Sequence, residues 1–153
     1  MKVAIGCDHG GYPLNEKVIA QIQALGHEVL DFGTHDGSAA DDYPDYARSV
    51  AEAIQKGEAD RGILICGSGV GVAITANKFR GIRSCLCHDT YSARQGVEHD
   101  NMNVLCLGAR IVGFELALEL VRSYMSATFS TEERHRRRSA KVDAIEAEQA
   151  SRA

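Results

Sequence analysis

One segment of the sequence combines a thiol with alternating glycines: CGSGVG, residues 66–71. Glycines at alternate positions let successive backbone N–H groups point into one concavity, which is typical of an anion site before a helix. A helix N-terminus lowers the pKa of a nearby thiol, so Cys66 is a candidate base near neutral pH. The alternatives are a tight strand-to-helix turn for the glycines and a buried, inert thiol for Cys66.

The glycine spacing excludes two common nucleotide-binding motifs. No Gly-Lys-Ser/Thr follows at the required distance, so the segment is not a P-loop. A dinucleotide fingerprint has the spacing GxGxxG after the first strand and an acidic residue about 20 positions later. Here the spacing is GxGxG after the third predicted strand, and residues 83–87 contain no acidic side chain.

Two Asp/His pairs are further candidates for chemistry. Asp8-His9 follows the first predicted strand, and His99-Asp100 is the second pair. Such pairs move protons or bind anions, whereas the alternatives are a helix cap for the first and a surface turn for the second. A metal site of Cys7, Asp8, His9 and His99 is a weaker alternative, because no CxxC or HxxxH spacing is present. The sequence therefore predicts no metal.

A basic run, RHRRR at residues 134–138, lies near the end of a chain whose net charge is −4. Arg134 and Arg138 are four residues apart, so on a helix they share one face and suit a phosphate group. The alternatives are a solvated face or a weak nucleic-acid patch. The acidic remainder of the chain and the lack of interleaved aromatic residues argue against a nucleic-acid partner.

Short apolar runs alternate with helical patterns along most of the chain. Their near-continuous apolarity indicates strands buried on both faces, as in a parallel sheet. The sequence predicts an α/β fold, a three-layer α/β/α sandwich with a five-stranded parallel, Rossmann-like sheet. The expected strands are 2–5, 28–32, 62–66, 82–87 and 104–107, and the clearest helical stripes lie at 14–25, 47–54 and 114–125.

The length of 153 residues fits one domain, and no apolar run approaches the 18 residues of a membrane span. The N-terminus lacks the apolar core of a signal peptide, so a cytoplasmic protein is predicted. Its five cysteines lie in or beside apolar runs, which favours reduced, buried thiols. The irregular connection 33–43 has a length typical of functional loops.

The C-terminal segment, from about 131 to 150, has the pattern of a charged helix. Its only large apolar positions are Val142 and Ile145. Such a narrow apolar face predicts that this helix docks onto something outside its own domain, such as another subunit.

Together these segments resemble the B-type ribose-5-phosphate isomerase family, which includes the subunits of galactose-6-phosphate isomerase. The resemblance covers residues 2–146. It depends on the segments CDHGGYPLNEKV, DDYPDYA, ICGSGVGVAITANKFRGIR, CHDTYSAR, NVLCLGARIVG and RHRRRSAKVDAIE. It implies a homodimer or a tetramer with active sites at the subunit interface. It also implies isomerisation of a phosphorylated sugar through a cis-enediolate, without metal or cofactor.

The resemblance also implies roles for individual residues. Cys66 matches the catalytic base, and the loop residues Gly67, Ser68, Gly69, Val70 and Gly71 match the anion hole. The residues that hold and open the furanose ring are matched by Asp8, Tyr43 and His99. The phosphate ligands are matched by His9, Arg134 and Arg138, with Arg110 as a further pocket arginine. The partner chain is expected to supply His99, Asp100 and Arg110.

Departures from the family pattern bear on the substrate. Some members use a glutamate directly after the glycine loop, but Val72 stands there, so this chain belongs with the cysteine users. Asp100 stands where many members have asparagine, and this position contacts the sugar. Ribose 5-phosphate is the predicted substrate. The alternatives are erythrulose 4-phosphate, allose 6-phosphate, or a phosphosugar-binding module without activity.

Overall fold

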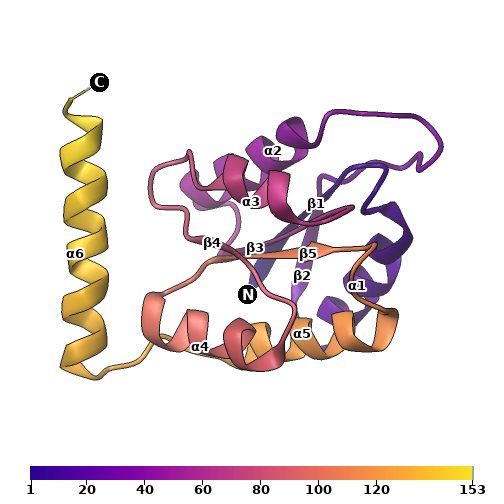
Figure 1. Ribbon diagram of the computed structural model, residues 1–153. Coiled ribbons are helices and arrows are strands. Elements are labelled where there is room, and N and C mark those ends of the chain that lie inside the picture. The colour runs from indigo at the N-terminus through magenta and orange to yellow at the C-terminus, as the bar shows by residue number, and fades with distance from the viewer. Residues whose placement is uncertain (153) are drawn as a thin grey trace.

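The computed structural model describes residues 1–152 and is built around a five-stranded sheet (Figure 1). Every pairing in the sheet is parallel, as the continuous apolarity of the strands predicted. The predicted three-layer α/β/α sandwich is confirmed. The strands are β1 (Lys2–Cys7), β2 (Glu28–Asp31), β3 (Arg61–Cys66), β4 (Ser84–Leu86) and β5 (Val104–Gly108), in the spatial order β2-β1-β3-β5-β4.

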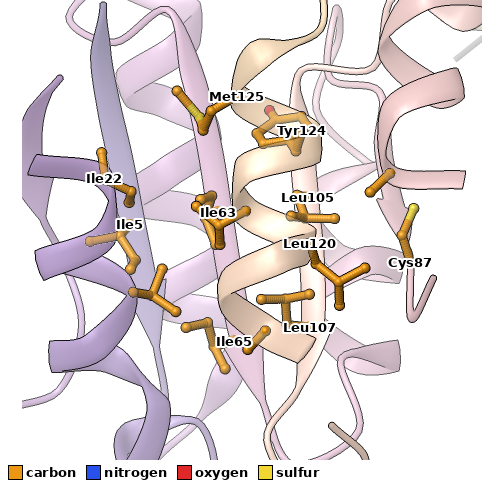
Figure 2. Packing of buried hydrophobic residues seen from close by; sticks show 14 of the residues in the cluster. Ile5, Ile22, Ile63, Ile65, Cys87, Leu105, Leu107, Leu120, Tyr124 and Met125 are labelled. Atoms are coloured by element: carbon orange, nitrogen blue, oxygen red, sulfur yellow. The ribbon is translucent and has the colours of Figure 1, made fainter. Parts of the chain in front are cut away.

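Helices cover both faces of the sheet because its side chains alternate between two apolar clusters. On β3, Ile63 and Ile65 belong to one cluster, while Leu64 and Cys66 belong to the other. Figure 2 shows the first cluster, in which strand residues pack against α5. This face carries α1 (Tyr12–Ala24), α4 (Thr90–Asp100) and α5 (Phe114–Ser126), and the opposite face carries α2 (Tyr43–Gln55) and α3 (Val70–Ala76).

Local signals in the sequence explain where several helices begin. Pro13 and Pro44 stand in the first turns of α1 and α2, where a missing N–H costs nothing. The Asp89 side chain caps α4 by accepting a hydrogen bond from the Ser92 N–H at 2.7 Å. Within residues 1–152, no helix is both long enough and apolar enough to cross a lipid bilayer.

Two residues of the predicted apolar stripes are not in the core. Leu25 is 38% exposed because α1 ends there, and Gly26 follows with a φ of +83°. Phe114 is 44% exposed because it is the first residue of α5, where its ring lies 4.4 Å from the Lys17 ammonium group. Both residues were predicted to be buried, and both are exposed because they lie at the end of a helix.

The last helix, α6 (Glu133–Ala150), stands beside the sandwich next to α4 (Figure 1). Arg83 ties it to the body of the protein through hydrogen bonds to the Ser139 hydroxyl and the Asp143 carboxylate. Val142 and Ile145 remain 54% and 58% exposed. The residues described therefore leave the apolar stripe of α6 uncovered.

Candidate active site

The topology leaves a crevice at the carboxyl ends of β1 and β3. These strands are neighbours, but the helices that follow them, α1 and α3, cover opposite faces of the sheet. In open α/β sheets, ligands bind at such a divergence. A cavity of about 360 Å³ lies there, lined by Asp8, His9, Gly10, Tyr43, Cys66, Gly67, Ser68, Gly71, Arg110 and Ile111.

Cys66 ends β3 and is 5% exposed. Its Sγ accepts a hydrogen bond from the Gly69 N–H at 3.0 Å, so the glycine loop folds back over the thiol. Gly69 has a φ of +79°, and a Cβ there would lie 2.5 Å from Leu86 Cδ1 and 2.9 Å from the Leu107 carbonyl carbon. Only glycine suits this backbone and this space, so the loop glycine does more than shorten a turn.

The rest of the glycine loop packs against two polar side chains of the cavity. Ser68 is exposed, and its Oγ accepts a hydrogen bond from the Val70 N–H at 3.3 Å. A Cβ at Gly71 would lie 2.7 Å from the Tyr43 ring, so this glycine lets the ring approach the backbone. The loop thus positions a hydroxyl and a phenol beside Cys66 within one chain.

Arg110 lines the cavity of its own chain, contrary to the expectation that it comes from the partner. Its N–H donates to the Gly67 carbonyl at 3.0 Å, and its guanidinium carbon lies 3.3 Å from where a Gly67 Cβ would be. The reason is the sheet register: β5 pairs directly with β3, with Gly108 opposite Cys66. The segment after β5 therefore lies beside the glycine loop of the same chain.

His9 is held by Asp41, a residue that the sequence analysis did not single out. Asp41 Oδ1 lies 2.9 Å from the His9 backbone nitrogen and 2.7 Å from His9 Nδ1, and Oδ2 accepts from the Tyr46 hydroxyl at 2.7 Å. Burial alone raises the pKa of Asp41, but these hydrogen bonds outweigh it and lower the pKa to about 2. The carboxylate accepts from Nδ1, which leaves Nε2 of His9 free for a ligand. The sequence signals for Asp41 are its place in the loop 33–43 and in the segment DDYPDYA, and neither gave this residue a role.

Asp8 is buried beside this pair, and its Oδ1 accepts from the Gly11 N–H at 2.9 Å. Ligand atoms of Asp8, His9 and Asp41 lie within 4.8 Å of one another, the kind of cluster in which a cation could be held. The metal alternative weighed from the sequence is not assembled, because His99 lies on α4 and lines a different cavity.

Six predicted site residues do not line the cavity: Gly69 and Val70, which belong to the glycine loop beside it, and four residues on α4 and α6. His99 lines a separate cavity of about 400 Å³, together with residues 128–132 before α6. Asp100 lines a third one of about 580 Å³ between α4 and α6. Arg134 and Arg138 are exposed on α6, and Arg134 Nε pairs with Glu132 at 2.8 Å. One chain therefore assembles the part of the predicted site that follows the strands, and not the part carried by α4 and α6.

The cysteines differ more than the sequence suggested. Burial raises the pKa of Cys7 and of Cys106 to about 12, as befits inert thiols. Cys85, expected to be buried, is exposed because β4 is a three-residue strand at the sheet edge. The neighbouring Cys87 thiol lowers the pKa of Cys85. Cys85 is therefore an exposed thiol that alkylating reagents can reach, away from the cavity that contains Cys66.

Comparison with known proteins identifies the family to which this chain is similar. The model of the Ribose/Galactose Isomerase family matches residues 3–142. Ribose-5-phosphate isomerase B of Escherichia coli is 46% identical over 145 residues, 95% of this chain and 96% of that protein. D-erythrulose-4-phosphate isomerase of Pectobacterium atrosepticum is 40% identical over 129 residues, 84% of this chain and 85% of that protein.

A solved structure agrees with these sequence matches. Ribose-5-phosphate isomerase B of Clostridium thermocellum superposes with a TM-score of 0.92 at 46% identity, over 97% of this chain and 99% of that one. The shared fold, the extent of the family match and the identity lead to one conclusion: the chain belongs to the ribose/galactose isomerase family.

Proposed function

We propose that this protein interconverts ribose 5-phosphate and ribulose 5-phosphate through a cis-enediolate, with Cys66 as the base. The observation that carries the proposal is the position of the Cys66 sulfur. It sits in the crevice between β1 and β3, accepts the Gly69 N–H at 3.0 Å, and shares the cavity with Ser68 and Arg110. A base, a hydroxyl and a cation in one small cavity suit a reaction that forms and discharges an oxyanion.

The reaction moves one hydrogen between adjacent carbons. The Cys66 thiolate removes the proton from C2 of the open-chain aldose, and the electrons of that C–H bond form the C1=C2 double bond while O1 takes the negative charge. A proton shifts from O2 to O1, the thiol returns a proton to C1, and O2 becomes the ketone oxygen. General acid–base catalysis of this kind contributes about 10²–10⁴-fold. Donors of the 67–71 loop stabilise the enediolate oxygens, and losing one such donor costs about 10²–10³-fold.

The phosphate group is assigned to His9 and to arginines. Asp41 holds His9 at Nδ1 and leaves Nε2 to the phosphate. Arg110 lines the same cavity, and Arg134 and Arg138 complete the set from another chain. Asp8 and Tyr43, which also line the cavity, hold the sugar ring.

A homodimer supplies what one chain lacks. His99, Asp100, Arg134 and Arg138 lie on α4 and α6, outside the cavity of their own chain. We propose that they complete the cavity of the partner, with α6 docking its exposed Val142 and Ile145 against the second copy. A tetramer of two such dimers is compatible with this arrangement. No nucleic-acid or membrane partner is proposed, and the cytoplasm remains the predicted location.

A four-carbon substrate is the second candidate, because a 40% identical relative is a D-erythrulose-4-phosphate isomerase. Asp100 is the residue that bears on this choice. Its ionised carboxylate accepts hydrogen bonds and cannot donate them, whereas asparagine does both. A site matched to a hydroxyl penalises analogues that lack it. Allose 6-phosphate is the six-carbon alternative.

The test is a comparison of kcat/KM for ribose 5-phosphate, erythrulose 4-phosphate and allose 6-phosphate, with wild type and Asp100→Asn. We expect ribose 5-phosphate to lead, with activity unchanged by EDTA. If kcat/KM for ribose 5-phosphate is about tenfold or more below that for another of these sugar phosphates, the other compound is the substrate. Binding of all three without turnover would identify a non-catalytic phosphosugar-binding module.

A further inference from the structure

Two imidazole rings stack at the junction of α4 and α6, outside the cavity that contains Cys66. His99 lies in the last turn of α4 and His135 in the first turn of α6, with ring centroids 3.9 Å apart and planes 17° from parallel. His135 is only 3% exposed, and its Nε2 has no hydrogen-bond partner within residues 1–152. Glu132 Oε2 lies 3.9 Å from this nitrogen, beyond hydrogen-bond distance. A buried imidazole without a hydrogen bond costs free energy, so its contact with His99 needs an explanation.

The His99 ring also makes a polar contact, through its Nδ1 atom. Gln95, one turn earlier on α4, places its Nε2 2.8 Å from His99 Nδ1. An amide nitrogen donates and does not accept, so Nδ1 is the acceptor in this pair. The neutral ring then carries its hydrogen on Nε2 and presents an N–H donor at that edge.

Burial, helped by neighbouring positive groups, keeps the His135 ring neutral. Burial is the main cause that lowers the pKa of His135, followed by the adjacent His99 ring and Arg134, while Glu132 opposes them. The charged neighbours along the two helices are Glu98, Asp100, Glu132, Arg134 and Arg138. Near neutral pH, the His135 ring is therefore uncharged, and it packs against the His99 ring without adding a positive charge beside it.

We propose that Gln95 and His135 are positioning residues for His99, and that together they present it to a cyclic substrate as an N–H donor at Nε2. The proposal rests on the proposed function, in which His99 meets the sugar in the partner's cavity. Gln95 selects the tautomer, and the His135 ring limits rotation of the imidazole. Neither residue touches substrate in this account.

The role concerns opening of the sugar ring and not the later proton transfer at carbon. Opening breaks the bond between C1 and the ring oxygen: the ring oxygen takes the electron pair and a proton, while the anomeric hydroxyl loses its proton and becomes the aldehyde oxygen. A hydrogen bond from His99 Nε2 to the ring oxygen favours this step because negative charge builds on that oxygen as the bond breaks. Ribulose 5-phosphate has its C5 hydroxyl esterified and is an open chain, so enediolate formation from it needs no ring opening. The two half-reactions can therefore be measured separately.

The first test compares turnover of cyclic ribose 5-phosphate with entry of solvent deuterium at C1 of ribulose 5-phosphate. We expect His135→Ala to lower kcat/KM for ribose 5-phosphate about tenfold, with deuterium exchange within about twofold of wild type. His135→Phe, which keeps a flat buried ring, should restore most of the lost turnover. Arg136→Ala, an exposed change on the next residue of α6, is the control and should leave both rates near wild type.

The proposal would be overturned by an equal loss in both rates or by a His135→Phe variant no more active than His135→Ala. The same difference between the two rates in Arg136→Ala would also overturn it. Wild-type protein that neither turns over ribose 5-phosphate nor exchanges deuterium would instead contradict the proposed function. The two failures are thus distinguishable.

The second test reads the tautomer directly by ¹⁵N NMR of the His99 ring and needs no substrate. We expect the neutral ring of wild type to carry its hydrogen on Nε2. Gln95→Glu replaces the donor with a carboxylate that only accepts, which should move the hydrogen to Nδ1 and lower turnover of ribose 5-phosphate about tenfold. Arg94→Leu, an exposed change on the preceding residue, is the control. A wild-type ring protonated at Nδ1, or a Glu variant with unchanged tautomer and turnover, would overturn the assignment.

Discussion

The carboxyl edge of the sheet and the α4–α6 edge of the molecule both carry residues expected in the active site, but they differ in completeness. At the sheet edge, Cys66, Asp8 and Arg110 line one cavity within one chain. At the α4–α6 edge, His99 and Asp100 line two other cavities, and Arg138 is exposed on its helix.

The difference follows from how each region is positioned. A parallel sheet brings the ends of all its strands to one edge, so residues after β1, β3 and β5 meet without any help from another chain. Helices at the side of a sheet have no such common point. His99 is stacked on His135 and lines a cavity other than the one that contains Cys66, and the arginines of α6 are exposed. The sheet edge assembles its groups within one chain, whereas the α4–α6 edge fits the proposal that its groups complete the cavity of a partner.

The largest effect is expected at the sheet edge. Cys66→Ala removes the base and should lower kcat by at least about 10²-fold, with substrate binding largely retained, because the base acts in the transition state. The measurement is steady-state turnover of ribose 5-phosphate together with binding of the substrate to the inactive variant.

Labelling experiments on Cys66 must also account for Cys85, because its thiol is exposed and its pKa is lowered by the Cys87 thiol. Iodoacetamide should label Cys85 without inactivation, so Cys85→Ser should retain activity and still be inactivated through Cys66, with protection by substrate. An alanine variant at position 66 with near-normal turnover would mean that another residue is the base.

At the α4–α6 edge, the strongest effect is expected from a phosphate ligand. Arg138→Ala removes a charge-assisted contact worth ~1.5–3 kcal/mol, which should weaken binding of ribose 5-phosphate by about 10–100-fold. Arg137→Ala is the matched control, because Arg137 is exposed one residue away and pairs with Glu133 at 3.0 Å. Free ribose should be a very poor substrate. Equal activity on ribose and its phosphate, or equal losses in both variants, would contradict the assignment.

The sequence predicted the regular part of this arrangement well. Apolar runs locate all five strands, and the CGSGVG segment marks the loop that covers Cys66, because sheet burial and a glycine turn are local properties of the sequence. β4 is shorter than the run 82–87 suggested, since an edge strand pairs on one side only.

Contacts between distant segments were not predictable in the same way. Asp41 meets His9 across 32 residues through an irregular loop that has no periodicity. His135 stands within a run of arginines, so nothing in its neighbours marks it as buried. Arg110 was assigned to the partner by resemblance alone, and the pairing of β5 with β3 corrects this.

Mixing experiments test directly whether the two regions belong to different chains of one site. Equal amounts of Cys66→Ala and His99→Ala chains should form half heterodimers, each with one intact site, and recover about a quarter of wild-type activity. Cys66→Ala mixed with Arg110→Ala should recover nothing, because each cavity then has one defect. Rescue in the second mixture would return Arg110 to the partner. Absence of rescue in the first, with heterodimers demonstrated, would place His99 and Cys66 in one chain.

The smallest effect is a pH dependence of stability that belongs to the sheet edge alone. Asp41 has a folded pKa of about 2, below the value of about 3.9 for an unfolded aspartate. A carboxyl group whose pKa is lower in the folded state stabilises the fold at pH values above its unfolded-state pKa. This stabilisation is lost as the pH falls through the folded-state pKa. Between pH 4 and pH 2 the wild type should therefore lose about 2 kcal/mol more free energy of unfolding than Asp41→Asn.

Denaturant unfolding at a fixed protein concentration measures this difference, since a dimer's stability depends on concentration. Asp42→Asn, at the adjacent exposed position, is the control and should follow the wild-type curve. Parallel curves for wild type and Asp41→Asn would show that the carboxylate is not held by His9 and Tyr46. A steeper wild-type curve would show that one chain builds this part of the site by itself, because the hydrogen bonds that depress the pKa are all internal to that chain.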